Sequence, residues 1–268
     1  MSSRPRILIS YFFGKDAIPL GASCADAFRE LGYEVACFNS QVEHPIGRHF
    51  LKWVDKLARG LGLRSANIAQ RTPWNNHRHR QRRLEQAVRE FKPDIVFVIR
   101  GNSFDAETLQ RLKQDHGVRH TVGWWVKDPR PDSTEMLDDA RRYDHYFCIH
   151  QFGYTPEDRI HHLPALAIDR RLYRATAPIE NRPYRHEIVF VGGWNQRRQA
   201  MVEHLLDLPI EIYGPGWRKK RNLFNLALQR RVKARGIWGE DLVELYNTSK
   251  IVLNITGWNT AAYTGQNL

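Results

Sequence analysis

Cysteines and long apolar runs are scarce in this chain of 268 residues. Its three cysteines, Cys24, Cys37 and Cys148, lie far apart without a CxxC spacing, which indicates reduced core residues of a cytoplasmic protein. No apolar run approaches the length of a membrane span, and the N-terminal segment has too few apolar residues for a signal-peptide core. We therefore expect a cytoplasmic protein that is, at most, peripheral at the inner face of a membrane.

Acidic residues are also in short supply, with 29 of them against 41 lysines and arginines. The formal net charge of +12 favours anionic partners such as nucleotides, nucleic acid, acidic glycans or membrane surfaces. In other respects the composition, with 42% hydrophobic residues, is that of a folded protein. The length allows two modest domains, each with its own core.

Apolar runs of strand length alternate with segments of helical spacing in the first part of the chain. Strands are predicted at 6–10, 33–38, 94–99, 120–126 and 145–149, and helices at 23–32, 82–94 and 103–117. Ser23 and Asp105 are expected to cap the first and third of these helices. Strands that are apolar on both faces and alternate with helices predict a doubly wound α/β domain with a parallel sheet.

The same plan restarts after a proline-containing stretch that shows no periodicity. Strands are predicted at 187–192, 210–214 and 250–255, with helices at about 196–206 and 240–248. We expect a first domain at 1–175, a linker at 176–186 and a partial second domain at 187–268. The strand 250–255 is then expected to be an exposed sheet edge with an uncovered apolar face.

The stretch "IVFVGGWNQRR" at 188–198 is a predicted strand that ends in two glycines and leads into an arginine-bearing helix. A parallel strand of this kind presents backbone N–H groups and a positive helix end at the carboxyl edge of the sheet, where α/β folds hold phosphates. Gly192 and Gly193 would let the backbone approach a ligand, and Arg197 and Arg198 would suit a diphosphate. Taken alone, the stretch equally allows a tight turn with solvated arginines.

The longer segments "IVFVGGWNQRRQAMVEHLLDLPIEIYGPGW" (188–217) and "LVELYNTSKIVLNITGWN" (242–259) resemble the C-terminal domain of the glycosyltransferases grouped with the spore maturation protein CgeB. "GWWVKDP" (123–129), "YDHYFCI" and "ALAIDRRLYR" are similar to parts of the family's first domain. The resemblance implies the GT-B fold, with two Rossmann-like doubly wound domains, the second incomplete because the family's Arg-x-Phe-Glu helix is not reached.

The same resemblance implies a bacterial-type glycosyltransferase. Its donor would be a nucleoside-diphosphate sugar and its acceptor a glycan, a lipid-linked glycan or a protein, and it would need no metal and no cofactor. Gly192, Gly193 and Arg198 would contact the donor phosphates, with Arg197 as an auxiliary charge. Gly214, in the "YGPGW" that ends the family's next strand, would lie at the same donor site.

Candidate residues in the first domain are less specific. Asp128, at the carboxyl end of a predicted strand, is a candidate base or acceptor-positioning residue, although a turn aspartate that caps the next helix fits equally well. Gly21 follows the first strand and could approach the donor. The triplet Arg100–Asn102 ends another strand and either reaches a ligand or forms a simple turn.

The remaining unusual segments are rich in basic residues. The histidines of "HRHRQRR" (77–83) and the pair His161–His162 lack a cysteine or carboxylate at metal-site spacing, so no metal is expected. The segments 49–62 and 217–236 have basic amphipathic spacing, and the apolar face of the second is formed by Leu223, Phe224, Ala227 and Val232. Each would be either a core-packed helix or a helix that lies on anionic lipid.

Two other functions stay open at this point. A nucleic-acid-binding protein would explain the net charge and the aromatic residues interleaved with arginine, although the basic residues are dispersed and no known nucleic-acid motif is present. A non-catalytic GT-B remnant would bind a partner, or a second copy of itself, through the open sheet edge at 250–255.

Overall fold

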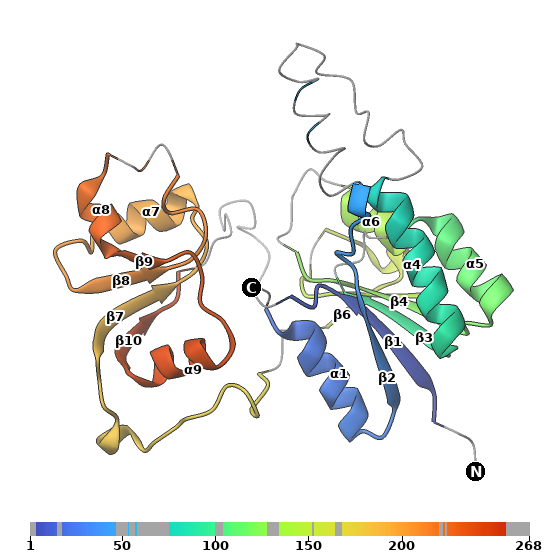
Figure 1. Ribbon diagram of the computed structural model, residues 1–268, viewed down its shortest axis with the longest axis horizontal. Coiled ribbons are helices and arrows are strands. Elements are labelled where there is room, and N and C mark those ends of the chain that lie inside the picture. The colour runs from blue at the N-terminus through green and yellow to red at the C-terminus, as the bar shows by residue number, and fades with distance from the viewer. Residues whose placement is uncertain are drawn as a thin grey trace. The chain divides into compact units, whose positions relative to one another are not determined.

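The chain forms two compact units, each built around its own parallel sheet (Figure 1). Unit 1 comprises Met1–Phe13 with Pro19–Leu166, and unit 2 comprises Gly14–Ile18 with Ala167–Leu268. The computed structural model describes residues 4–14, 18–46, 53, 57, 75–99, 104–127, 134–151, 153–163, 168–219, 222 and 224–255.

Unit 1 holds a six-stranded sheet in the order β2-β1-β3-β4-β5-β6, with every pair parallel. Its strands are β1 (Arg6–Tyr11), β2 (Glu34–Asn39), β3 (Ile95–Ile99), β4 (His120–Trp125), β5 (His145–Cys148) and β6 (Ile160–His162). Its helices are α1 (Leu20–Glu30), α4 (Asn76–Phe91), α5 (Ala106–His116) and α6 (Glu135–Ala140), with a 3-10 turn η2 (Pro156–Asp158). This is a doubly wound order, so the predicted parallel α/β architecture is confirmed.

The two faces of this sheet are covered by different helices, as Figure 1 shows. On one face Leu8 and Val96 pack in a buried cluster with Leu84 of α4 and Leu109 of α5. On the other face Ile9 belongs to the cluster that contains residues of α1. Leu8 and Ile9 are neighbours in β1, and successive strand residues point to opposite faces, so both must be apolar.

Two of the predicted helix starts need correction. Helix α1 begins at Leu20, and the Ser23 amide donates to the Pro19 carbonyl (2.9 Å), so Ser23 lies inside the helix and does not cap it. Helix α4 begins six residues earlier than predicted, because Asn75 accepts a hydrogen bond from the Arg78 amide (2.7 Å) and caps a polar first turn. Asp105 does occupy the N-cap position of α5, but its carboxylate pairs with His77.

Unit 2 holds a four-stranded parallel sheet in the order β10-β7-β8-β9. Its strands are β7 (His186–Val191), β8 (Ile210–Tyr213), β9 (Val232–Ala234) and β10 (Ser249–Leu253). The helices are α7 (Gln196–Glu203), α8 (Leu226–Arg231) and α9 (Gly239–Asn247), and a 3-10 turn η3 (Ile179–Asn181) precedes the sheet. Helices α7 and α8 cover one face and α9 the other (Figure 1). In chain order the strands are arranged 3-2-1-4, as in the first half of a Rossmann fold.

The segment 217–236 is not one amphipathic helix, so that prediction was wrong. It contains the six-residue α8 followed directly by β9, and Leu228 and Val232 are buried while Phe224 and Ala227 are exposed. The physical reason is local: the Asn225 side chain accepts a hydrogen bond from the Leu228 amide (3.1 Å) and starts a new helix there. The other such segment, 49–62, lies outside the described residues apart from positions 53 and 57.

Strand β10 lies at one end of the unit 2 sheet, as expected from the sequence. Ile251 and Val252 of this strand are 50% and 42% exposed, so the predicted position at a sheet edge is confirmed within the described part of the chain, while the uncovered apolar face stays a prediction. Within the same part, no helix is long and apolar enough to cross a membrane.

Candidate functional site

The carboxyl end of β7 is the best-defined candidate site. Strands β8 and β9 follow on one side of β7 and β10 lies on the other, so the order of the sheet switches direction beside β7. Open α/β sheets bind ligands at such a switch point, outside the carboxyl ends of the strands. Gly192 and Gly193 come directly after β7, and Gln196 begins α7.

Gly192 and Gly214 are required by contacts between two neighbouring loops. The Gly192 amide donates to the Tyr213 carbonyl (2.8 Å), and the Gly192 carbonyl accepts from the Trp217 indole N–H (2.8 Å). A Cβ on Gly214 would overlap with the Gly192 carbonyl oxygen, and the φ of Gly214 is +156°. A Cβ on Gly192 would lie 2.8 Å from the ring of Phe190. Packing therefore accounts for both of these glycines.

Gly193 differs from these two glycines. A Cβ built on it would meet its nearest described neighbour, the Pro215 ring, at 3.6 Å, which is an ordinary van der Waals distance. The φ of Gly193 is not positive, so its backbone conformation is open to other residues. Neither packing nor strain in the described structure requires glycine here, and close approach of a ligand to the backbone stays the prediction for this position.

Arg198 joins the two sides of the switch point. One terminal nitrogen donates to the Gly193 carbonyl (2.9 Å) and Nε donates to the Ile255 carbonyl (2.8 Å), just beyond β10. Its guanidinium also lies 5.7 Å from the centre of the Phe190 ring, and Asn195 caps α7 by accepting from the Arg198 amide (2.8 Å). The Arg198 side chain, which we predict to contact a phosphate, is thus held at this edge by two hydrogen bonds. Arg197 is exposed on the same first turn.

A cavity of about 330 Å³ lies beside these loops, lined by Pro215, Arg235, Gly236 and Trp238. The Pro215 carbonyl accepts from the Trp194 amide (2.8 Å), so the cavity shares a wall with the loop after β7. Sequence reasoning missed Arg235, because it placed 217–236 in one helix, and Trp238, which lies between that segment and the helix predicted at about 240–248. The available signal was "RGIWGE", a glycine-bounded turn between a short apolar strand and the next helix.

In unit 1 the predicted site residues are placed differently. Gly21 lies in the first turn of α1, where a Cβ would come within 2.6 Å of the Tyr11 ring and 3.0 Å of the Phe13 ring. Helix-to-strand packing thus accounts for a glycine at that position. Asp128 and the triplet Arg100–Asn102 lie outside the described residues. Lys127, just before Asp128, pairs with Glu135 at 2.9 Å.

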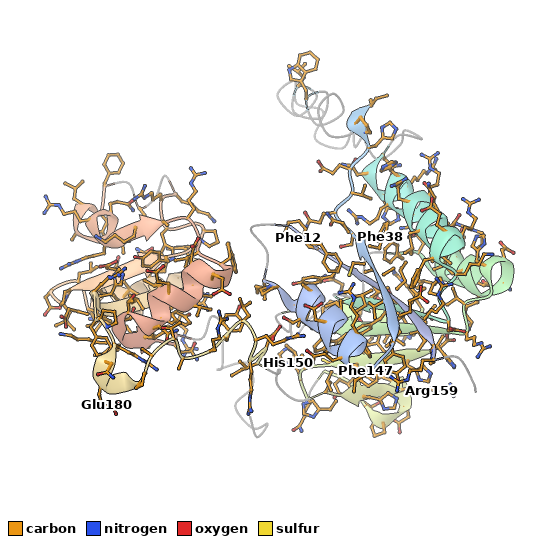
Figure 2. All side chains as sticks on the ribbon, turned by 60° about the horizontal axis from the view of Figure 1, so that its bottom comes forward. Phe12, Phe38, Phe147, His150, Arg159 and Glu180 are labelled. Carbon is orange, nitrogen blue, oxygen red and sulfur yellow. The ribbon has the colours of Figure 1, made fainter. Side chains whose placement is uncertain are left out.

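Unit 1 adds one titratable group that the sequence did not single out. His150, labelled in Figure 2, follows β5 and is buried. Its Nε2 lies 3.1 Å from the Lys127 carbonyl oxygen, and its own carbonyl accepts from the Tyr154 hydroxyl (2.9 Å). An imidazole is therefore fixed at the carboxyl end of β5, next to the end of β4. Among the described residues, no group of three His, Cys, Asp or Glu side chains could hold a metal ion.

Residues 197–267 match a family model described as glycosyl transferase-like. The chain is similar to an alpha-glucosyltransferase in complex with UDP and a 13-mer DNA, with a TM-score of 0.54 and 12% identity over 96% of this chain and 73% of that one. The chain has a GT-B glycosyltransferase-like fold.

Other solved structures share this GT-B-like arrangement. A UDP-N-acetylglucosamine 2-epimerase from Rickettsia bellii gives a TM-score of 0.52 at 11% identity, over 97% of this chain and 76% of that one. S. aureus MnaA with UDP gives 0.50 at 12% identity, over 94% and 74%. No curated protein matches the chain. At these identities the likeness shows the fold, and together with the family match the GT-B fold supports transferase activity.

Proposed function

We propose that this protein is a CgeB-like, metal-independent glycosyltransferase that binds a nucleoside-diphosphate sugar at the carboxyl edge of the unit 2 sheet. The observation that carries the proposal is Gly193, which lies at the switch point and has room for a side chain that the sequence does not supply. A diphosphate that contacts the backbone would use that room.

The charges at this edge suit a diphosphate leaving group. Arg198 is held by the Gly193 and Ile255 carbonyls, so its positive charge needs no rearrangement when the sugar leaves. The N-terminus of α7, with Arg197 in its first turn, adds backbone N–H groups and the positive end of the helix dipole. Fixed positive groups of this kind can stabilise the departing diphosphate without a metal ion.

The cavity beside Pro215 suits the nucleoside part of the donor. Trp238 offers an aromatic face for a base, and Arg235 offers donors to ribose or phosphate oxygens. The close contact of Gly214 with Gly192 keeps the loop after β8, which contains Pro215, against the loop after β7. Two of the similar structures contain UDP, which supports a uridine nucleotide as the first donor to test.

Transfer requires an acceptor hydroxyl that attacks the anomeric carbon while the bond from that carbon to the diphosphate oxygen breaks. The diphosphate leaves with the electron pair, and for transfer with inversion a base of unit 1 takes the hydroxyl proton. Asp128 is our candidate base, and the buried His150 is a second candidate. We propose a glycan, a lipid-linked glycan or a protein as the acceptor and the bacterial cytoplasm as the compartment.

The proposal is tested by calorimetric titration of the chain with UDP, GDP, TDP and CDP. We expect one nucleotide to bind, and Arg198→Ala to weaken it by at least about tenfold through loss of a charge-assisted contact. Arg141→Ala removes the same charge from the surface of unit 1 and should leave the affinity unchanged. Because Arg198 also tethers Ile255, thermal unfolding is recorded for each variant. If none of the four nucleotides binds, or if Arg198→Ala binds like wild type, the proposal is wrong.

A further inference from the structure

The segment from Trp217 to Gly236 has an extreme charge balance. Within these twenty residues lie eight basic side chains and no acidic one, the basic residues being Arg218, Lys219, Lys220, Arg221, Arg230, Arg231, Lys233 and Arg235. The segment therefore carries most of the excess positive charge of the chain. Such a concentration of one sign attracts an extended anionic surface more strongly than a single small anion.

Two large apolar side chains project into solvent from the middle of this segment. Phe224 is 92% exposed, more than any other large hydrophobic residue in the described part of the chain, and Leu226 is 65% exposed. Scattered exposed leucines are normal on a protein surface, but an almost fully exposed phenylalanine beside a second large apolar residue is not. We call Phe224 and Leu226, with the exposed Lys219 and Arg230, the basic apolar corner.

The scaffold around this corner holds the apolar side chains outward. Asn222 is buried and donates to the Trp217 carbonyl (3.1 Å), and Trp217 is itself fully buried. Asn225 caps α8 and donates to Glu203 (3.0 Å), while Leu228 is buried in the core. Buried or anchored residues therefore bracket Phe224 and Leu226 on both sides. The two side chains cannot both turn inward unless these anchors are lost.

Positive charge flanks the apolar pair on both sides. Arg218 and Lys219 precede it, and both are exposed. The Lys219 ammonium lies 5.4 Å from the centre of the Trp194 ring, which holds it near the start of the corner. Arg230 is exposed on α8, after the apolar pair. An apolar tip within a basic rim complements the boundary of an anionic bilayer, where acyl chains meet negatively charged head groups.

We propose that the basic apolar corner docks unit 2 on an anionic lipid surface. Phe224 and Leu226 enter the boundary between head groups and acyl chains, and the flanking lysine and arginine side chains contact the lipid phosphates. A nucleic acid fits less well, because bases stack on aromatic rings and an aliphatic Leu226 offers no such face. The corner would hold the protein beside a membrane without a spanning helix, whichever nucleotide the protein binds.

Vesicle sedimentation tests this proposal with the full chain. We expect binding to vesicles of phosphatidylcholine mixed with phosphatidylglycerol, and little binding to phosphatidylcholine alone. The double variant Phe224→Ser with Leu226→Ser should weaken that binding by about tenfold or more, since it removes the apolar area that enters the bilayer. Arg230→Glu should weaken vesicle binding more at low salt than at high salt, because salt screens the contacts between charges.

Ile251→Ser is the matched control, since it removes a half-exposed apolar side chain from β10. It should leave vesicle binding unchanged. All of the substituted side chains are exposed, so thermal unfolding should report a folded protein for every variant. Equal sedimentation of wild type and the double variant would overturn the proposal. The proposal would also be wrong if the protein bound single-stranded or duplex DNA tightly, lost that binding in the double variant, and did not bind anionic vesicles. The corner would then be a nucleic-acid surface.

Discussion

The glycines that follow the first strand of each unit serve different purposes. In unit 1, Gly21 follows β1 and the rings of Tyr11 and Phe13 occupy the space where its side chain would be. In unit 2, Gly193 follows β7, and the nearest atoms of the described structure leave room for a Cβ. Both loops connect a buried parallel strand to a helix, so the sequence plan is the same in both units.

Gly21 thus serves packing, whereas Gly193 leaves the backbone accessible. A ligand site needs room beside the backbone, and of these two glycines only Gly193 has it. We therefore assign the diphosphate to unit 2. Alanine substitutions of these glycines test the difference directly. The expected loss of unfolding free energy decreases from Gly214, through Gly21, to Gly193.

Gly214→Ala should have the largest effect on stability. The new Cβ would overlap with the Gly192 carbonyl, in a backbone conformation that other residues rarely adopt. We expect unit 2 to lose on the order of 3 kcal/mol of unfolding free energy. Peptide-resolved hydrogen exchange in urea measures this, and unit 1 peptides act as the internal control. Unchanged protection of β7 and β8 would show that the two loops are not packed as described.

One carboxylate in each unit should also make the free energy of unfolding depend on pH, in opposite directions for the two units. Burial raises the pKa of Asp139 in unit 1 to about 6, despite the hydrogen bond from the Tyr146 hydroxyl (2.6 Å). In unit 2, burial raises the pKa of Glu211, but hydrogen bonds from Tyr213 and His186 outweigh it and the net shift is downward. Asp139 thus favours the folded state below pH 4, a contribution lost as pH rises through about 6. Glu211 favours it at higher pH, a contribution lost on acidification.

Asp139→Asn isolates the unit 1 part of this difference. Asparagine keeps an acceptor for the Tyr146 hydroxyl without a buried charge, so the variant should be about 2 kcal/mol more stable than wild type at pH 7. The gain should shrink as the pH falls and approach zero below pH 4, where the wild-type carboxyl becomes protonated in both states. Urea unfolding across this pH range measures the difference. A variant that is less stable at pH 7 would mean that the Arg142 contact, at 3.8 Å, outweighs the burial.

Gly21→Ala should lower the stability of unit 1 by about 1–2 kcal/mol, because its Cβ would lie 2.8 Å from the Cβ of Tyr11. Alanine is otherwise the better helix former, which limits the loss. Nucleotide affinity should not change. The measurement is urea unfolding together with calorimetric titration, and a selective loss of affinity in this variant would move the ligand towards unit 1.

Gly193→Ala should change stability least, by less than about 0.5 kcal/mol, since its Cβ fits beside Pro215. The same methyl group would occupy the space that we assign to the diphosphate, so nucleotide affinity should fall by about tenfold or more. Titration and unfolding of the same preparation report both quantities. An unfolded variant, or one with wild-type affinity, would remove the distinction between Gly193 and Gly21.

Most strands and long helices of both units were predictable from sequence, because strands buried on both faces read as continuous apolar runs. Two strands were missed, β6 and β9, each only three residues long. Such a strand is too short to show a period and forms only because it pairs with a neighbour, β5 or β8. Helix α4 was shortened in the prediction because its first turns are polar, and only the Asn75 cap reveals its start.

The candidate site was predictable in position but not in detail. The stretch "VGGWNQRR" identified the strand end, the glycines and the arginines from local sequence. That Gly192 serves packing while Gly193 does not depends on where the Gly214 loop meets it, and Arg235 and Trp238 come together with Pro215 only in the folded chain. These are contacts between segments far apart in sequence, which local patterns do not specify.

The most direct measurement is hydrogen exchange of the full chain with and without saturating UDP. We expect slower exchange in the peptide that contains Gly193 and the start of α7, and no change in the peptide that spans the loop after β1. Protection of the segment after β1 instead, or UDP binding that leaves the Gly193 peptide unprotected, would contradict the assignment of the diphosphate to the open backbone at the end of β7.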